Sequence, residues 1–442
     1  MKKTLLLTAF NFIFFLIHAQ VLPLREQAKL IDEITAERLN TVLPTLMEQH
    51  GIDMWVLITR EYNEDPIVKT MLPATWLSAR RRTILVFINQ PEKKLFKKLA
   101  VARYSVGSEI TAAWDMQKFP DQWDALIDIV QNYQPKKIAI NTSENFGHAD
   151  GLDHTEYKLF TDKLPVTFKT KIVSNEPLAV GWLETRIERE LQLWPQLIKL
   201  SKDIIAEGFS NKVITPGITT AEDLVWWYRQ KIQNLGLNTW FHPSVEIQRN
   251  DSVVFDHLKA FSSKGWDNSN TIRPGDLLHV DFGISYLRLN TDIQEHAYVL
   301  MPGEKQAPAF LQKAMEQGNR LQDILTEQFK AGKTGNQILA DALAQAKKEN
   351  IAATIYTHPI GYHGHAAGPT IGLWDQQGGV PGSGDFPLHY KTAYSIELNA
   401  AVPIKEWKKN IRIMLEQDGY FDETGFRYIA GRQTQLHLVG FE

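Results

Sequence analysis

Two apolar segments of this 442-residue chain lie next to aspartates, and this pattern limits how the chain can fold. The strand-like run 277–280 leads directly into Asp281, and Asp292 follows eleven positions later, before the apolar run 297–300. Two strands joined by a short connection would place both carboxylates at neighbouring positions. A buried carboxylate costs several kcal/mol unless it is paired or bound to a cation. The two aspartates therefore either lie at exposed strand ends or face a cation.

Further potential metal ligands follow in the C-terminal part of the chain. His358, His363 and His365 occur within eight residues and are interleaved with glycine, while Glu397 and Glu416 each interrupt a strand-like run. A single glutamate of this kind is typical of an edge strand that faces water. Together with the aspartates, these side chains form an oxygen and nitrogen ligand set sufficient for two divalent ions. The chain has no cysteine, which excludes disulfides, thiolate ligands and cysteine nucleophiles.

The first half of the chain alternates helical and strand-like segments, which predicts a small α/β domain. The predicted elements are a helix over 30–49, strands over 54–58, 83–88 and 137–140, and a helix near 123–133. A charged amphipathic helix is predicted from Glu184 to about Glu207, and Thr220 with Asp223 forms a predicted capping box. We place the domains at residues 20–178 and 179–442.

The N-terminus has the features of a signal peptide. Lys2 and Lys3 precede the apolar run 5–17, and Ala19 is the small residue of a cleavage site. Residues 1–19 are therefore predicted to be removed on export, to the periplasm or as a secreted protein; the alternative is an uncleaved N-terminal anchor. No other segment is long and apolar enough to span a membrane. A net charge of −3 without a basic run gives no reason to expect nucleic acid as a partner.

The order of the motifs resembles that of the pita-bread metallopeptidase superfamily, which includes methionine aminopeptidases, Xaa-Pro aminopeptidases, prolidases and, without metals, creatinase. The family's ligand order falls on Asp281, Asp292, His365, Glu397 and Glu416. The resemblance covers about residues 180–442, and 30–140 resembles the smaller N-terminal domain of the prolidase and creatinase branch. It is nearest the two-domain Xaa-Pro aminopeptidases. The implied fold class is α/β and α+β: a creatinase/prolidase-like α/β domain followed by a pita-bread domain.

The resemblance also implies a dinuclear metal centre that hydrolyses Xaa-Pro peptide bonds, as an aminopeptidase or a dipeptidase. Asp281 would chelate one ion, Asp292 and Glu416 would bridge both, and His365 with Glu397 would complete the other. Hydroxide held between the ions would be the nucleophile, and Glu397 would carry a proton to the leaving amine. Manganese is the expected metal, with cobalt, zinc or iron as alternatives. The expected partners are a peptide substrate and a second copy of the chain.

The sequence departs from the family pattern at the histidines. His363 is an alternative ligand, although His365 has both the preceding glycine and the glycine three positions on. The family's second histidine stands seven positions after the ligand, where this chain has Gly372. The substrate-contacting role is therefore predicted for His363 or His358, together with His257 upstream.

Two other functions are compatible with parts of this pattern. A pita-bread domain that serves only as a binding or interaction module would explain the glycine at position 372. The complete ligand set argues against it, because buried carboxylates without a cation are costly. Metal-free hydrolysis of a small C–N substrate, as in creatinase, fits poorly because that branch lacks the ligand set.

Overall fold

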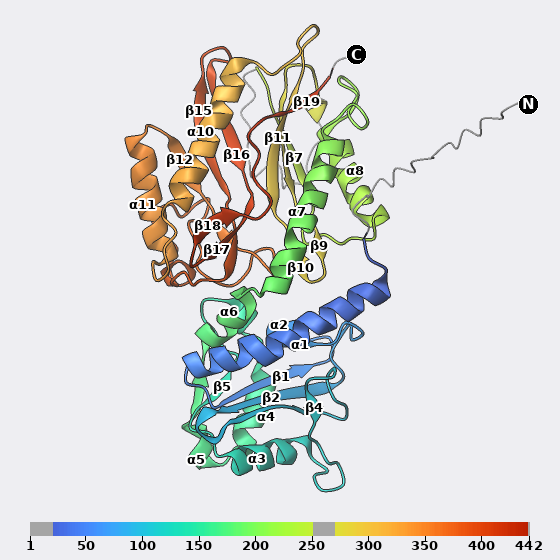
Figure 1. Cartoon of the computed structure of the whole chain (residues 1–442), viewed down its shortest axis with the longest axis vertical. Helices are drawn as coiled ribbons and strands as arrows, with labels where there is room; N and C mark the ends of the chain where they lie inside the picture. Colours follow the sequence, from blue (N-terminus) through green and yellow to red (C-terminus); the bar gives the residue numbers. More distant parts are fainter. Residues whose placement is uncertain (1–20, 251–269, 441–442) are drawn as a thin grey trace, which may run out of the picture.

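The computed structural model describes residues 21–250 and 270–440, which form two lobes (Figure 1). The predicted signal peptide, residues 1–19, lies outside the described residues, so its cleavage stays a prediction. Among the helices of the described part, none is both long and apolar enough to cross a membrane.

The N-terminal lobe is built around a six-stranded mixed sheet with the strand order β4-β3-β2-β1-β5-β6. Strands β1, β2 and β3 are antiparallel, whereas β1, β5 and β6 are parallel. The predicted helices and strands of this region are confirmed. The elements are α1 (Leu24–Gln49), β1 (Met54–Arg60), α2 (Pro66–Met71), β2 (Arg82–Gln90), η1 (Pro91–Lys93), β3 (Leu95–Val101), β4 (Thr111–Ala112), α3 (Gln122–Tyr133), β5 (Ile138–Ile140), η2 (Gly147–Ala149), α4 (His154–Lys163), α5 (Val166–Lys169), β6 (Ile172–Ser174) and α6 (Glu176–Glu184).

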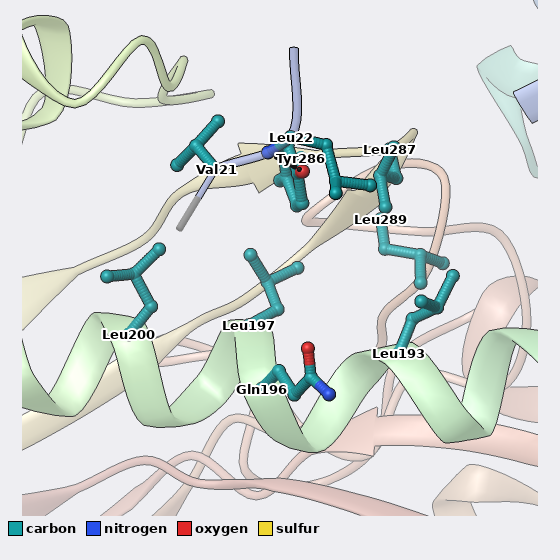
Figure 2. A pocket seen from close by; sticks show the side chains of 9 residues that line it. All are labelled: Val21, Leu22, Leu193, Gln196, Leu197, Leu200, Tyr286, Leu287 and Leu289. Atoms are coloured by element: carbon teal, nitrogen blue, oxygen red, sulfur yellow. Dashed lines mark hydrogen bonds between the residues drawn. The ribbon is translucent and has the colours of Figure 1, made fainter. Parts of the chain in front are cut away.

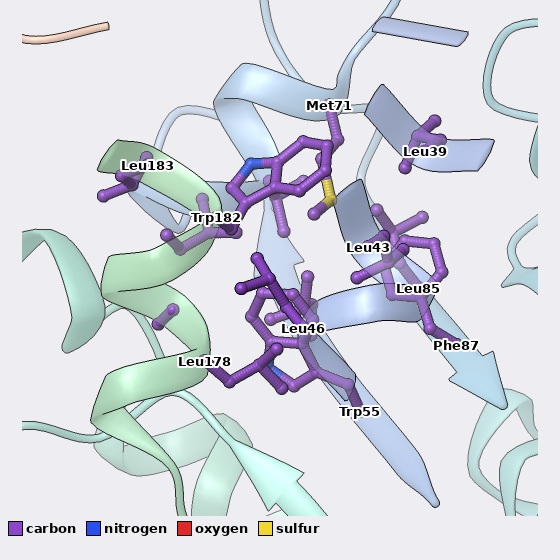
Figure 3. Packing of buried hydrophobic residues seen from close by; sticks show 14 of the residues in the cluster. Leu39, Leu43, Leu46, Trp55, Met71, Leu85, Phe87, Leu178, Trp182 and Leu183 are labelled. Carbon is purple, nitrogen blue, oxygen red and sulfur yellow. The ribbon is translucent and has the colours of Figure 1, made fainter. Parts of the chain in front are cut away.

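Apolar side chains on both faces of this sheet are buried, which explains why its strands are nearly continuous hydrophobic runs. On one face, Trp55 and Phe87 pack against Leu43 of α1 and Trp182 of α6 (Figure 3). On the other face, β1 and β2 pack against α3 and α4. Each large apolar side chain that is fully buried contributes about 1.5–3 kcal/mol to folding.

The chain passes between the lobes at residues 185–187. The charged helix predicted to start at Glu184 begins later, as α7 (Glu188–Gly208), because Ile187 has an extended conformation and the side chain of Glu190 accepts a hydrogen bond from its backbone N–H. The predicted domain boundary falls inside α6, whose apolar residues pack in the core of the N-terminal lobe. The division into domains at that position stays a prediction.

In the C-terminal lobe, the strands lie between two helical layers, α7 and α8 on one side and α10 and α11 on the other (Figure 1). The strand orders are β19-β11-β8-β7, β12-β15-β16 and β13-β14-β17-β18, and β9 pairs with β10. The remaining elements are α8 (Ala221–Asn234), β7 (Ser244–Gln248), β8 (Leu277–Phe282), β9 (Ser285–Tyr286), β10 (Leu289–Asn290), β11 (Ile293–Val299), α10 (Ala309–Thr326), α11 (Gly335–Lys348), β12 (Ala352–Ile355), β13 (His358–Pro359), η4 (Ser383–Asp385), β14 (Thr392–Ser395), β15 (Leu398–Ile404), β16 (Lys409–Leu415), β17 (Asp418–Asp422), β18 (Gly425–Tyr428) and β19 (His437–Val439).

Local sequence signals define several of these elements. The predicted capping box at the start of α8 is confirmed, because the Asp223 backbone N–H donates to Thr220 Oγ1 and the Thr220 backbone N–H donates to the Asp223 carboxylate. Two backbone hydrogen bonds between Gln294 and Glu416 then join β11 to the end of β16. This contact brings two distant parts of the chain together at the site described next.

Candidate metal centre

Along β8 and β11, apolar and polar side chains alternate, so that the two strands have an apolar face and a polar face. Leu278 and Val280 of β8, with Ile293 of β11, point into the core beneath α7 and α8. In a strand, successive side chains point to opposite faces. Asp281 therefore lies on the other face, where its register partner across the sheet is Gln294. Asp292 comes two residues before Gln294 and lies on the same face.

Two glutamates reach this polar face from other strands. Glu416 follows β16 directly and is held against β11 by the backbone bonds to Gln294, of 3.1 and 3.4 Å. Glu397 lies between β14 and β15, and its carbonyl accepts hydrogen bonds from the Tyr356 backbone N–H at 3.1 Å and from Thr357 Oγ1 at 2.9 Å. Both glutamates are buried.

His358 supplies a buried imidazole at the same place. It stands on β13, where it pairs with Ser395 of β14. Its Nε2 atom lies 3.6 Å from Asp292 Oδ2, 3.4 Å from Glu416 Oε1 and 3.9 Å from Glu397 Oε2. The five side chains form two overlapping groups with potential donor atoms within 4.8 Å of one another: Asp281, Asp292 and Glu416 in one, and His358, Glu397 and Glu416 in the other.

The electrostatics of this cluster call for positive charge. Burial raises the pKa of Asp281 and that of Asp292 well above the usual range, and the neighbouring Glu416 raises them further. Burial and Glu416 raise the pKa of Glu397 in the same way. Among the described residues, Asp281 Oδ1, Asp292 Oδ1 and His358 Nε2 have no hydrogen-bond partner although they are buried. Buried oxygen and nitrogen atoms that accept no hydrogen bond can instead bind a cation, and carboxylates together with an imidazole are suitable ligands for divalent metal ions.

The three histidines predicted from the sequence occupy different places. His365 is exposed, its ring centroid lies 4.6 Å from that of His358, and it forms a third potential ligand group with Asp292 and His358. The ring centroid of His363 instead lies 4.2 Å from that of His148 in the N-terminal lobe, with the two rings tilted by 41°, and His363 is in none of the potential ligand groups found in the described part of the chain. His257 lies outside the described residues.

Sequence reasoning gave His358 only a secondary role, although a signal for a larger one was present. His358 and His365 are seven positions apart, the separation that the resemblance implies between a ligand histidine and the second histidine. With His365 taken as the ligand, the second histidine was expected seven positions later, where the chain has Gly372. The polar side chains behind the carboxylates were also missed: Ser395 Oγ donates to Glu416 Oε1 at 2.8 Å, and Asp418 Oδ2 accepts from the Asp292 backbone N–H at 3.4 Å.

Aromatic side chains surround the exposed His365. Its ring centroid lies 5.1 Å from that of Trp240 and 5.7 Å from that of Tyr356, whose hydroxyl is 3.2 Å from His365 Nε2. Trp374 contacts Tyr356 in turn, at 5.9 Å between ring centroids. Partial burial of its ring lowers the pKa of His365 to about 4, and the neighbouring His358 disfavours a charge on it as well.

A separate apolar hollow lies beside α7 (Figure 2). Aliphatic side chains such as Leu193 and Leu197 line it, together with Tyr286 and the first described residues, Val21 and Leu22. Among the described residues that line this hollow, none carries a carboxylate or an imidazole.

Comparison with known proteins relates this site to a family. The sequence profile of metallopeptidase family M24 matches residues 196–417, a range that contains all five side chains of the acidic cluster and His365. No curated protein sequence matches the chain.

Solved structures resemble the chain over nearly its whole length. An X-Pro aminopeptidase from Thermotoga maritima is 17% identical, with a TM-score of 0.61 over 89% of this chain and 99% of the other. An Xaa-Pro dipeptidase from Bacillus anthracis is 16% identical, with a TM-score of 0.55 over 94% and 100%. The dipeptidase PepE from Mycobacterium ulcerans is 14% identical, with a TM-score of 0.59 over 92% and 99%. At these identities the likeness concerns the fold, and it confirms the prediction of an α/β domain followed by a pita-bread domain.

Proposed function

The chain belongs to metallopeptidase family M24, as its motif order predicted, and from this premise we propose that it hydrolyses Xaa-Pro peptide bonds with the help of two divalent metal ions. The observation that carries the proposal is the convergence of four carboxylates and one imidazole, from five separate parts of the sequence, in a buried cluster with unpaired acceptor atoms.

We assign the ligands as the family order implies, with one change. Asp281, Asp292, Glu397 and Glu416 would hold the two ions with their carboxylates. His358 takes the place predicted for His365, because His358 is buried with its Nε2 within 4 Å of Asp292, Glu397 and Glu416. Manganese is the proposed metal, since oxygen ligands outnumber nitrogen ligands.

When bound, such ions polarise the scissile carbonyl and make a coordinated water acidic near neutral pH. The residues of the chain supply the rest of the chemistry. Glu397 accepts a proton at its carboxylate and passes it to the leaving amine. His365, seven positions after the proposed ligand, is exposed next to the cluster and donates or accepts a hydrogen bond at the substrate through its imidazole.

The preference for proline rests on the surroundings of His365. Trp240, Tyr356 and Trp374 present aromatic surfaces there, against which a compact apolar ring packs well. The solved structures with the same fold that are titled X-Pro aminopeptidase and Xaa-Pro dipeptidase support the same specificity.

The second candidate, a binding module without hydrolytic activity, loses its main support under this assignment. It rested on a glycine at position 372, where the histidine after a His365 ligand would stand. With His358 as the ligand, His365 occupies the equivalent position.

The proposal is tested with a panel of peptides that have or lack proline in the second position. Metal-depleted protein is supplied with single ions, and we expect Mn²⁺ to restore cleavage of the Xaa-Pro members. His358→Ala should lose both Mn²⁺ binding and cleavage, whereas His365→Ala should keep Mn²⁺ binding and lose cleavage about 100-fold. Equal loss of Mn²⁺ binding in both variants would contradict the assignment of His358. Failure of every ion to restore cleavage of any peptide would overturn the function.

A further inference from the structure

A buried glutamine connects two of the proposed ligands. The amide of Gln294 lies between Glu397 and Glu416, with Nε2 at 2.7 Å from Glu397 Oε1 and 2.8 Å from Glu416 Oε2. Gln294 is 3% exposed, so water does not substitute for these bonds. Each hydrogen of the amide group is therefore committed to one carboxylate.

The chemistry of the partners fixes the orientation of this amide. Carboxylates that hold a cation are ionised and only accept hydrogen bonds, so the NH₂ group of Gln294 must face them. Its Oε1 atom then points the other way, where His279 Nε2 lies 2.9 Å away. Because Oε1 can only accept, His279 must carry its proton on Nε2.

The remaining ring nitrogen of His279 faces a further carboxylate. His279 Nδ1 lies 3.7 Å from Glu246 Oε2, and Glu246 is the register partner of His279 on β7. Glu246, His279 and Gln294 therefore form a polar row across β7, β8 and β11 that ends at Glu397 and Glu416. All three side chains are buried, at 4%, 3% and 3% exposure.

A neighbouring histidine on the same face shows that such a row is not a general property of this sheet. His296 Nδ1 lies 3.0 Å from the Leu278 carbonyl, and its Nε2 accepts from the Met414 backbone N–H at 2.9 Å. Both ring nitrogens of His296 are used by backbone groups, so it ties strands together. His279, by contrast, reaches a side chain that contacts the proposed ligands.

We propose that Gln294 is a positioning residue that holds Glu397 and Glu416 in the geometry required by the metal pair, and that His279 orients its amide. This inference rests on the proposed metal centre but not on the identity of the substrate. A neutral amide suits the role because it donates to both carboxylates without adding a charge that would compete with the cations. Groups that orient metal ligands commonly change metal affinity or activity about 10- to 100-fold when they are replaced.

The proposal is tested by titrating the metal-depleted full-length protein with Mn²⁺ in a calorimeter. Gln294→Met keeps the volume of the side chain but removes both donors, and should weaken Mn²⁺ binding about 10- to 100-fold. It should also lower kcat for an Xaa-Pro peptide while KM stays within about 2-fold, because Gln294 is buried and has little surface to offer to a peptide.

Substitutions at His279 distinguish a role in orienting the Gln294 amide from a role in folding alone. His279→Phe should weaken Mn²⁺ binding, and His279→Gln, whose amide can place an N–H near the position of Nε2, should restore most of the affinity. The matched control is Gln433→Met. Gln433, between β18 and β19, is also a buried glutamine, but it bonds to the backbone N–H and carbonyl of His296 on β11, so its loss should lower the melting temperature and leave Mn²⁺ affinity unchanged.

The outcomes distinguish this proposal from the proposed function. If Gln294→Met binds Mn²⁺ as tightly as wild type, the positioning role is overturned. If Gln294→Met does not fold, the His279 variants decide instead, and an equal loss of Mn²⁺ affinity in His279→Phe and His279→Gln overturns the role. Wild-type protein that binds Mn²⁺ but cleaves no peptide contradicts the function, and the calorimetric comparison still decides the role of Gln294. Wild-type protein that binds no Mn²⁺ overturns both.

Discussion

The acidic cluster and the junction between the lobes both bury charged side chains, but they balance the charge in different ways. At the junction, Glu190 of α7 lies 3.1 Å from Arg38 of α1 and 3.3 Å from Arg186, and the chain itself supplies the cations. Both guanidinium groups also lie over the ring of Tyr362, at 5.0 and 4.7 Å from its centroid. In the acidic cluster, the four carboxylates face one another and His358.

The pKa directions express this difference. Burial raises the pKa of Glu190, but Arg186 and Arg38 outweigh it, and the pKa lies below its ordinary value. Burial and the neighbouring carboxylates both raise the pKa of Asp281 and Asp292. Charges balanced within the chain can stabilise an arrangement of the lobes, whereas carboxylates that face one another offer a place for cations from outside. This contrast separates a structural cluster from a functional one without reference to any motif.

The contrast predicts that removing a carboxylate from the acidic cluster destroys activity and relieves repulsion. Asp292→Asn should lower kcat/KM at least ~10³-fold, because a proposed metal ligand is lost and with it several kcal/mol of transition-state stabilisation. The metal-free variant should unfold at a higher temperature than metal-free wild type. Peptide assays measure the loss of activity, and thermal unfolding in the presence of a chelator measures the change in stability. The control is Asp203→Asn on the exposed face of α7. Lower stability of metal-free Asp292→Asn would break the comparison.

At the junction the same kind of substitution should have the opposite effect on stability. Glu190→Gln leaves two buried guanidinium groups without their carboxylate and should cost about 3 kcal/mol of unfolding free energy. Urea denaturation measures this loss, and added Mn²⁺ should not shift its size. Glu188→Gln, on the same turn but exposed, should change the free energy by less than about 0.5 kcal/mol. Similar values for the two variants would show that the junction cluster is not required for stability.

Elements with a local signal were predictable from the sequence. Continuous apolar runs predicted β1 and β2 because both faces of that sheet are covered, and Thr220 with Asp223 predicted the start of α8. The carboxylates of the acidic cluster stood out because each interrupts an apolar run. These inferences need only the residues within one element.

The choice of histidine and the polar row needed contacts between distant elements. Three histidines lie within eight residues, and only the pairing of β13 with β14 places His358, rather than its neighbours, beside Glu416. Gln294 resembles any polar strand residue until β16 brings Glu416 to it. The predicted start of α7 was too early for a similar reason. Arg38, far away in the sequence, donates hydrogen bonds to the carbonyls of Trp182 and Thr185 at the end of α6, before α7 begins.

Glu184 sharpens the comparison because it shows a third way to bury a carboxylate. It is buried at the junction, and among the described residues its Oε2 atom has no hydrogen-bond partner. Burial raises the pKa of Glu184 from 4.5 to about 8, although Arg186 lowers it in part. The raised pKa predicts that a proton, in place of an arginine or a metal ion, balances this carboxylate at neutral pH.

The folded protein keeps this proton at pH values where the unfolded chain releases it, so the contribution of Glu184 to stability falls as pH rises from about 4.5 to about 8. Glu184→Gln should remove that decline, which amounts to at most about 1.4 kcal/mol per pH unit. Urea denaturation of both proteins at several pH values in this range, in the same metal-free buffer, measures the difference in slope. Glu188→Gln should keep the wild-type slope. Identical slopes for wild type and Glu184→Gln would show that Glu184 is ionised in the folded protein and balanced by Arg186, and the junction would then use only one way to bury a carboxylate.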